Sequence, residues 1–114
     1  GAEGSLSDGL NFIPGKVVHL KSNGCNNRVP HVGWNDTIVK ESSRLFENVK
    51  SGNDFYYVHS YCFIPENGDH VSALTNYDCE IVAAVEKDWV FGTQFHPEKS
   101  SEVGFKLLEN FLNL

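Results

Sequence analysis

At 114 residues the chain has room for a single modest domain, and its 40% hydrophobic content is ordinary for a globular protein. A formal net charge of −6 argues against nucleic acid as a partner, because proteins that bind polyanions carry clustered lysine and arginine. No apolar run approaches the roughly 18–20 residues that a membrane helix requires, so we expect no membrane partner.

Turn signals divide the first part of the chain into short apolar runs, a pattern typical of β-strands. Residues 12–20 predict a strand that ends at an Asn-Gly pair, which favours positive backbone angles. Residues 29–39 predict an extended or irregular segment, in which Pro30 restricts strand pairing near the start. A short helical turn is the prediction for residues 38–46, where the apolar pattern is less regular.

Four further apolar runs predict strands in the second half of the chain. Aromatic and β-branched residues dominate 55–64, and a second Asn-Gly pair then turns the chain toward a strand at 71–74. The runs 81–85 and 89–96 flank a short Glu-Lys-Asp segment, so we expect a tight hairpin there. Residues 81–85 are nearly all apolar, which predicts burial on both faces of the sheet.

The last segment changes to a helical period. Its apolar stripe consists of Val103, Leu107, Leu108, Phe111 and Leu112. Ser100 or Ser101 can serve as the N-cap, and Glu102 suits the positive end of the helix dipole. The fold class that follows is α/β, a body rich in antiparallel strands closed by one amphipathic helix. The chain has too few helices for a complete doubly wound domain.

The cysteines and histidines suggest neither a disulfide framework nor a metal centre. The three cysteines are odd in number and widely spaced, which favours free thiols in a reducing cytoplasm. The N-terminus predicts no signal peptide, and the absence of Met indicates a processed chain or a piece of a longer one. No two histidines have metal-ligand spacing, so we expect neither a metal nor a cofactor.

His96 and Glu98, separated by one proline, form the strongest candidate for catalysis. Residues two apart in an extended segment point to the same side, and Pro97 biases His96 away from the helical region. A carboxylate can therefore reach the imidazole and fix its tautomer, as in the pair that activates a Ser or Cys nucleophile. The competing interpretation is a surface His-Pro turn with a solvated glutamate.

Four segments of the chain resemble the class I glutamine amidotransferases. Residues 92–100, Gly-Thr-Gln-Phe-His-Pro-Glu-Lys-Ser, are similar to that family's G-x-Q-F-H-P-E motif. Residues 9–17, 29–35 and 56–61 match further segments in the family's order and spacing. Within the family, the Pro-His-x-Gly-Trp-Asn element of 29–35 most resembles the glutaminase subunit of imidazole glycerol phosphate synthase, an enzyme of histidine biosynthesis. The resemblance implies the C-terminal portion of a flavodoxin-like amidotransferase domain.

The resemblance implies a role for each matching residue. In this family a cysteine thiolate attacks the side-chain amide of glutamine and releases ammonia. His96 corresponds to the general base, and Glu98 to the residue that orients it. Ser60 and Tyr61 correspond to residues that hold glutamine, and Glu3 to the acidic residue that binds its amino group.

The resemblance also implies a partner. Trp34, Asn35, Tyr56 and Lys99 match positions that dock onto the cyclase subunit, a (β/α)8 barrel into which ammonia passes. Without the motif, the two aromatic residues would be read as core residues. By the same standard, the lysine would be a solvated charge and the asparagine a turn residue.

The family's nucleophile elbow, Gly-x-Cys-x-Gly, has no match in this sequence. Cys25 lies in a predicted turn, Cys62 follows the glutamine-holding element, and Cys79 lies between two acidic residues that would raise a thiol pKa. We therefore expect residues 1–114 to be the C-terminal portion of one amidotransferase domain, inactive alone, with a bared sheet face. Two alternatives are an amidotransferase of aminosugar biosynthesis and a non-catalytic docking fragment.

Overall fold

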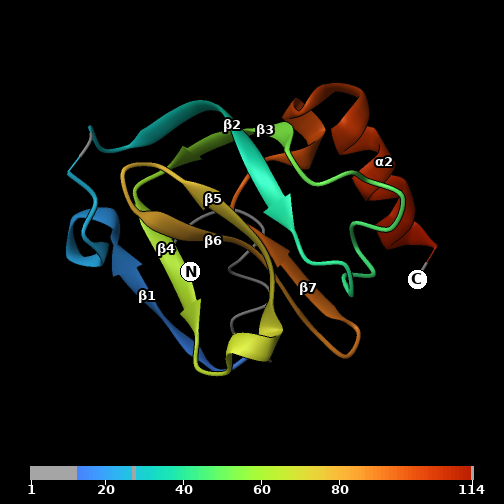
Figure 1. Ribbon diagram of the computed structural model, residues 1–114, viewed down its shortest axis with the longest axis horizontal. Helices are drawn as coiled ribbons and strands as arrows, with labels where there is room; N and C mark the ends of the chain where they lie inside the picture. Colours follow the sequence, from blue (N-terminus) through green and yellow to red (C-terminus); the bar gives the residue numbers. More distant parts are fainter. Residues whose placement is uncertain (1–12, 27, 114) are drawn as a thin grey trace.

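The computed structural model describes residues 13–26 and 28–113 of the chain. Its elements are β1 (Gly15–His19), η1 (Leu20–Asn23), β2 (His31–Val39), β3 (Asn53–His59), β4 (Tyr61–Pro65), η2 (Gly68–His70), β5 (Val71–Asn76), β6 (Glu80–Lys87), β7 (Val90–Thr93), η3 (Pro97–Lys99) and α2 (Ser101–Leu112) (Figure 1). Five strands form one sheet in the order β3-β2-β5-β6-β7, and β1 pairs with β4 in a second sheet. The predicted strand-rich body with a C-terminal helix is confirmed.

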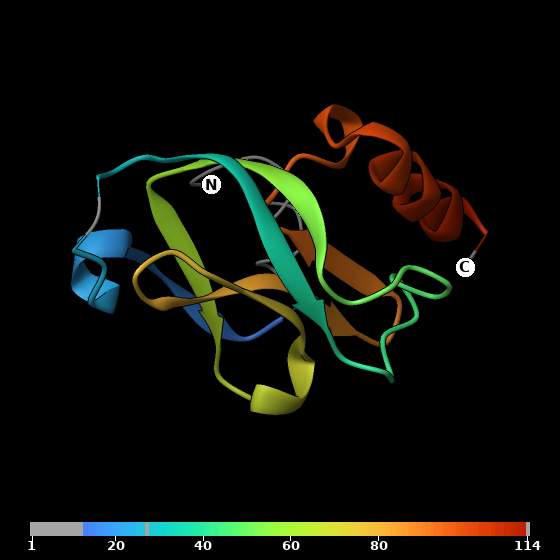
Figure 2. The same ribbon diagram turned by 45° about the horizontal axis from the view of Figure 1, so that its top comes forward.

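Every strand pairing within the described residues is antiparallel. The two-stranded sheet and α2 lie at opposite ends of the molecule, with the larger sheet between them (Figures 1 and 2). None of the described helices is long and apolar enough to span a membrane.

The strand β2 occupies the position next to the edge strand β3. It pairs with β3 from His31↔His59 to Thr37↔Asn53, and with β5 near its C-terminal end. Pro30 immediately precedes the strand, so its missing N–H removes no hydrogen bond from the ladder. The segment predicted as extended or irregular is therefore a regular strand along nearly its whole length.

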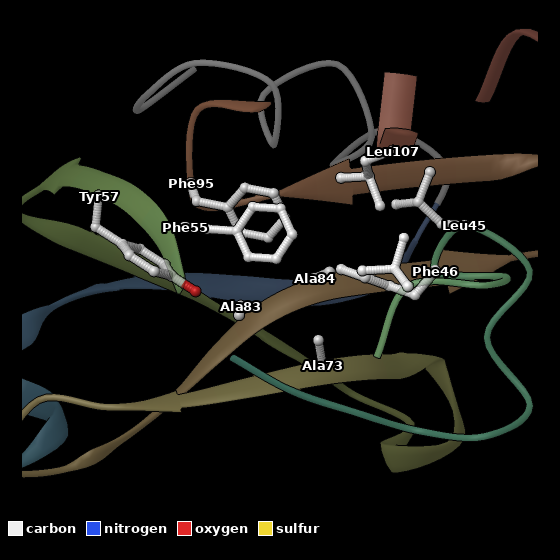
Figure 3. Packing of buried hydrophobic residues seen from close by; sticks show 10 residues of the cluster. Leu45, Phe46, Phe55, Tyr57, Ala73, Ala83, Ala84, Phe95 and Leu107 are labelled. Carbon is white, nitrogen blue, oxygen red and sulfur yellow. The ribbon is translucent and has the colours of Figure 1, made fainter. Parts of the chain in front are cut away.

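The main core lies between the five-stranded sheet and α2. Its two central rings, Phe55 and Phe95, have centroids 4.2 Å apart. Leu107 of α2 points into the same cluster beside Leu45 (Figure 3). Because Phe95 directly precedes His96, this packing fixes the backbone on which the candidate catalytic residue is carried.

Only part of the predicted helical stripe is buried. Leu107 is 1% exposed, whereas Phe111 and Leu112 are 49% and 79% exposed. Asn110, which the periodicity assigns to the solvent side, instead donates to the backbone carbonyls of Leu45 and Glu47 at 2.9 and 2.7 Å. The end of the helix is thus fixed both by hydrogen bonds to a loop whose carbonyls need donors and by the edge-on contact of Phe111 with Phe91.

Several predicted boundaries are wrong. The apolar run at 55–64 is interrupted at Ser60, where the chain leaves the larger sheet and enters the smaller one. Of residues 38–46, which were predicted to hold a helical turn, Ile38 and Val39 end β2 and the rest form turns. The hairpin between β6 and β7 is confirmed, but its second strand ends at Thr93 and leaves His96 in a loop.

The prediction that all three thiols are free is also wrong. Cys25 and Cys79 form a disulfide, with Cα atoms 5.1 Å apart, and Cys62 remains as a buried free cysteine. The two partners are 54 residues apart in the sequence, so only the tertiary fold brings them together. The cytoplasmic localisation stays a prediction.

Candidate active site

His96 and Glu98 are joined as their spacing predicts. The Nδ1 atom of His96 lies 2.9 Å from Oε1 of Glu98. Because a carboxylate oxygen only accepts, Nδ1 carries a proton, and in the neutral imidazole Nε2 is then the unprotonated nitrogen. The His96 side chain is 31% exposed, so Nε2 belongs to a ring that is accessible yet held in one orientation. This is the arrangement that a general base requires.

The middle of β3 anchors the loop that carries His96. The backbone N–H of His96 donates to the carbonyl of Tyr56 at 2.9 Å. Ser100 closes a second connection, because its Oγ donates to the His96 carbonyl at 2.6 Å and accepts from the Tyr56 N–H at 3.0 Å. Ser100 is fully buried, so these bonds are protected from water. The side chain of the predicted N-cap residue therefore bonds the loop that carries His96 to the sheet instead of capping the helix.

Helix α2 packs directly onto the turn between His96 and Glu98. At Gly104 the helix comes so close that an added Cβ would overlap the carbonyl oxygen of Pro97 and lie 3.0 Å from Cβ of Ser100. Only glycine permits this approach. The turn is therefore held on one side by the sheet and on the other by the helix.

Ser60 and Tyr61 form the corner between β3 and β4. The Ser60 carbonyl accepts from the N–H of Leu20 at 3.0 Å, and the Tyr61 carbonyl accepts from the Nδ1–H of His59 at 2.9 Å. The Tyr61 side chain is 42% exposed. Strand β3 thus positions both the His96 loop, through Tyr56, and the Ser60–Tyr61 corner, through His59. These two residues of β3 are about 10 Å apart along the extended chain.

A buried histidine pair, which the sequence did not single out, lies behind this corner. Nδ1 of His31 is 2.8 Å from Nε2 of His59, and the two residues are 2% and 1% exposed. Burial, together with the neighbouring imidazole of His59, lowers the pKa of His31 to about 4. Burial also lowers the pKa of His59, and the charge of His96 lowers it further. Predicting this pair from the sequence would require the register between two strands, because the two histidines are 28 residues apart.

The predicted docking residues divide into three groups. Trp34 and Tyr56 are cross-strand partners on the outer face of β2 and β3, with ring centroids 5.7 Å apart. Lys99 is exposed in η3, and its backbone N–H donates to the His96 carbonyl at 3.1 Å. The Asn35 amide turns to β5 instead and donates to the Asn76 carbonyl at 2.7 Å. The structure therefore brings the two aromatic residues together but engages Asn35 elsewhere.

The described part of the chain contains no activated cysteine. Burial raises the pKa of the Cys62 thiol to about 11, so this group is a poor nucleophile near neutral pH. Cys25 and Cys79 are bonded to one another. Glu3 lies outside the described residues. Among residues 13–26 and 28–113, no cluster of His, Cys, Asp and Glu could hold a metal ion.

An apolar hollow lies near the site. It has a volume of about 280 Å³ and lies between β7 and α2, and Phe91, Leu107 and Phe111 are among the residues that line it. Glu98 lies at its border, but His96 does not line it. This hollow is therefore not a substrate site built around the imidazole.

Comparisons with known proteins agree with the motifs. The family model of glutamine amidotransferase class-I matches residues 11–114. The HisH subunit of imidazole glycerol phosphate synthase from Pelagibacter ubique is 46% identical over the whole chain, which covers 55% of that protein. The HisH subunit of Pyrococcus furiosus is also 46% identical, over 94% of the chain and 54% of the relative.

A solved structure supports the fold independently. The crystal structure of a putative GMP synthase subunit from Thermoplasma acidophilum superposes with a TM-score of 0.74 at 23% identity, over 96% of this chain and 52% of that one. At this identity the likeness shows the fold alone. The chain spans about half the length of the relatives that it matches.

Proposed function

Because the chain belongs to the class I glutamine amidotransferase family, we propose that it forms the C-terminal part of a glutaminase subunit of imidazole glycerol phosphate synthase. The hydrogen bond between His96 and Glu98 is the observation that carries this proposal. The 41–46% identity to proteins named HisH favours the histidine pathway over aminosugar synthesis. The proposed compartment is the cytoplasm.

The proposed reaction uses a nucleophile from the part of the domain that these residues do not include. A cysteine thiol gives its proton to Nε2 of His96, and the thiolate attacks the amide carbon of glutamine. The imidazolium then returns the proton to the leaving ammonia, and water hydrolyses the thioester to glutamate. Glu98 stabilises the imidazolium through its bond to Nδ1.

The remaining predicted residues bind glutamine and the cyclase in this proposal. Ser60 and Tyr61 hold the substrate from the corner between β3 and β4, and Glu3 binds its ammonium group. Trp34 and Tyr56 present an aromatic surface to the (β/α)8 barrel, with Lys99 beside it. Ammonia crosses that contact without entering bulk water. The inward bonds of Asn35 favour a supporting role, in which it fixes the strand that carries Trp34.

The test uses the complete protein that carries this chain, mixed with its cyclase subunit. We expect release of ammonia from glutamine, its loss in His96→Ala, and its retention in His70→Ala, an imidazole in η2. Activity that survives in His96→Ala would contradict the catalytic assignment. Extending the genomic reading frame upstream is the matching sequence test, because it should encode Gly-x-Cys-x-Gly. Ammonia-dependent conversion of the histidine-pathway intermediate by the complex separates this function from the aminosugar alternative.

A further inference from the structure

The buried pair of His31 and His59 connects the sheet to the corner that the proposed function assigns to glutamine. We propose that both are positioning residues for substrate binding, which fix the Ser60–Tyr61 corner through a directed chain of hydrogen bonds. The inference rests on the proposed function for the identity of the substrate. The chain of bonds itself rests on the contacts of the described residues.

The direction of the chain follows from its last acceptor. The Tyr61 carbonyl can only accept, so Nδ1 of His59 must carry a proton. A neutral His59 then has an unprotonated Nε2, which accepts from Nδ1 of His31 at 2.8 Å. Both imidazoles are therefore in the Nδ1–H tautomer. A single arrangement of protons satisfies every bond in the chain.

Packing keeps the pair neutral and still. The ring of His31 is stacked between Tyr57 and Tyr77, with centroid distances of 4.9 and 4.1 Å. Burial lowers the pKa values of both histidines, so neither is charged near neutral pH. A ring held on both faces cannot change rotamer without opening the core. His31 thus fixes the orientation of His59 as well as its tautomer.

The corner needs such a device because of where it lies. Ser60 is the one residue between β3 and β4, which belong to different sheets, so no single ladder spans the turn. The Leu20 bond to Ser60 holds the corner from the η1 side, and the His59 bond to Tyr61 holds it from the β3 side. The β1–β4 ladder pairs Tyr61 with His19, so the His59 bond is what sets this residue relative to β3, which also holds the backbone of His96. Loss of the His59 bond would weaken substrate binding more than chemistry.

Matched substitutions at His31 test this role in the complete protein bound to its cyclase. His31→Leu removes the donor, whereas the amide of His31→Asn can place an N–H close to the position of Nδ1. We expect His31→Leu to raise the KM for glutamine about tenfold with kcat within about twofold of wild type, the size of effect of one lost hydrogen bond. His31→Asn should restore most of the affinity. An unchanged KM in His31→Leu, or equal defects in both variants, would overturn the proposal.

Nitrogen NMR of the wild-type imidazoles provides a readout that does not depend on turnover. We expect both rings to show a protonated Nδ1 and an unprotonated Nε2 at neutral pH. An Nε2–H tautomer at either histidine would refute the directed chain, even if His31→Leu fails to fold. A wild-type complex without glutaminase activity would instead refute the proposed function, and the NMR result would still decide the hydrogen-bond chain.

Discussion

The imidazole of His96 donates from Nδ1 to Oε1 of Glu98 across a single proline, at 2.9 Å. Pro97 begins the 3-10 turn η3, which folds the carboxylate back toward the ring. The carboxylate is 56% exposed, so water screens its charge and its main effect is orientation. The pair is therefore an imidazole with a fixed tautomer beside a solvated carboxylate, rather than a buried pair of charges.

Replacing Glu98 by Gln should lower kcat without unfolding the protein. The amide removes the negative charge and can present an N–H to Nδ1, which favours the wrong tautomer. We expect kcat for glutamine hydrolysis to fall about 100-fold, the lower end of the range for general acid–base catalysis, because the carboxylate is exposed. Steady-state kinetics of the complete protein with its cyclase measure this. Glu102→Gln, in the first turn of α2, is the matched control and should keep full activity.

Gly104→Ala should disturb the catalytic turn from the side of the helix. Alanine favours helix formation by roughly 1 kcal/mol over glycine, yet the new Cβ would overlap the Pro97 carbonyl. Overpacking of this kind costs about 1–3 kcal/mol, so we expect a lower free energy of unfolding and a lower kcat. Gly68→Ala is the control, since nothing lies within 4 Å of its added Cβ. Equal behaviour of the two variants in denaturant titrations and assays would contradict the close contact.

The buried histidine pair should make the fold sensitive to acid. The pKa of His31 is lowered from 6.5 to about 4, so the unfolded chain binds the proton more tightly. Its contribution to stability is therefore present above pH 6.5 and is lost as the pH falls from 6.5 to about 4, by roughly 3 kcal/mol at about 1.4 kcal/mol per pKa unit. His59, whose pKa is also lowered, acts in the same direction, and the charge of His96 adds to it.

Urea unfolding at a series of pH values measures this dependence. The free energy of unfolding should decrease between pH 6.5 and 4 in the wild type and decrease less in His31→Asn, which has no group to protonate. The His70→Asn variant should follow the wild type. Parallel curves for all three proteins would show that the pair contributes nothing to the acid response.

The sequence predicted those features whose residues all lie within one short segment. His96 and Glu98 are two residues apart, so their contact could be predicted from the spacing, but it forms through the 3-10 turn η3 rather than along the extended strand that was expected. The hairpin of β6 and β7 and the start of α2 are similarly local. The pair of His31 and His59 depends on the register of two strands, which an alternating pattern alone does not determine.

Other misses share this long-range character. The apolar run from β3 into β4 has no glycine or proline at Ser60, so nothing local indicated that it divides between two sheets. Cys25 and Cys79 meet only because the turn between β5 and β6 packs into the same cluster as Leu20 and Cys62, which are distant in the sequence. The inward direction of Asn35 depends on β5 being a neighbour, a fact of topology rather than of spacing.

The outer face of β2 and β3 should be the surface that meets the cyclase. Trp34 is 50% exposed against Tyr56, and Val32 and Val58 pair beside them at 55% and 38% exposure, so the face is apolar over two adjacent strands. Large aromatic side chains of this kind carry much of the binding free energy in protein interfaces. Trp34→Ala should therefore weaken the complex by about 2 kcal/mol, roughly 30-fold in Kd.

Calorimetric titration of the complete protein with the cyclase subunit measures that loss. Trp89→Ala is the matched control, because Trp89 is 70% exposed but lies in the hairpin of β6 and β7 against Arg44. Its loss should leave the Kd within about twofold, as expected for a surface residue outside the contact. If both substitutions raise the Kd equally, the exposure of the tryptophans alone explains the loss of affinity, and the docking face is not the one formed by β2 and β3. If only Trp89→Ala raises the Kd, the cyclase binds the hairpin end of the sheet instead.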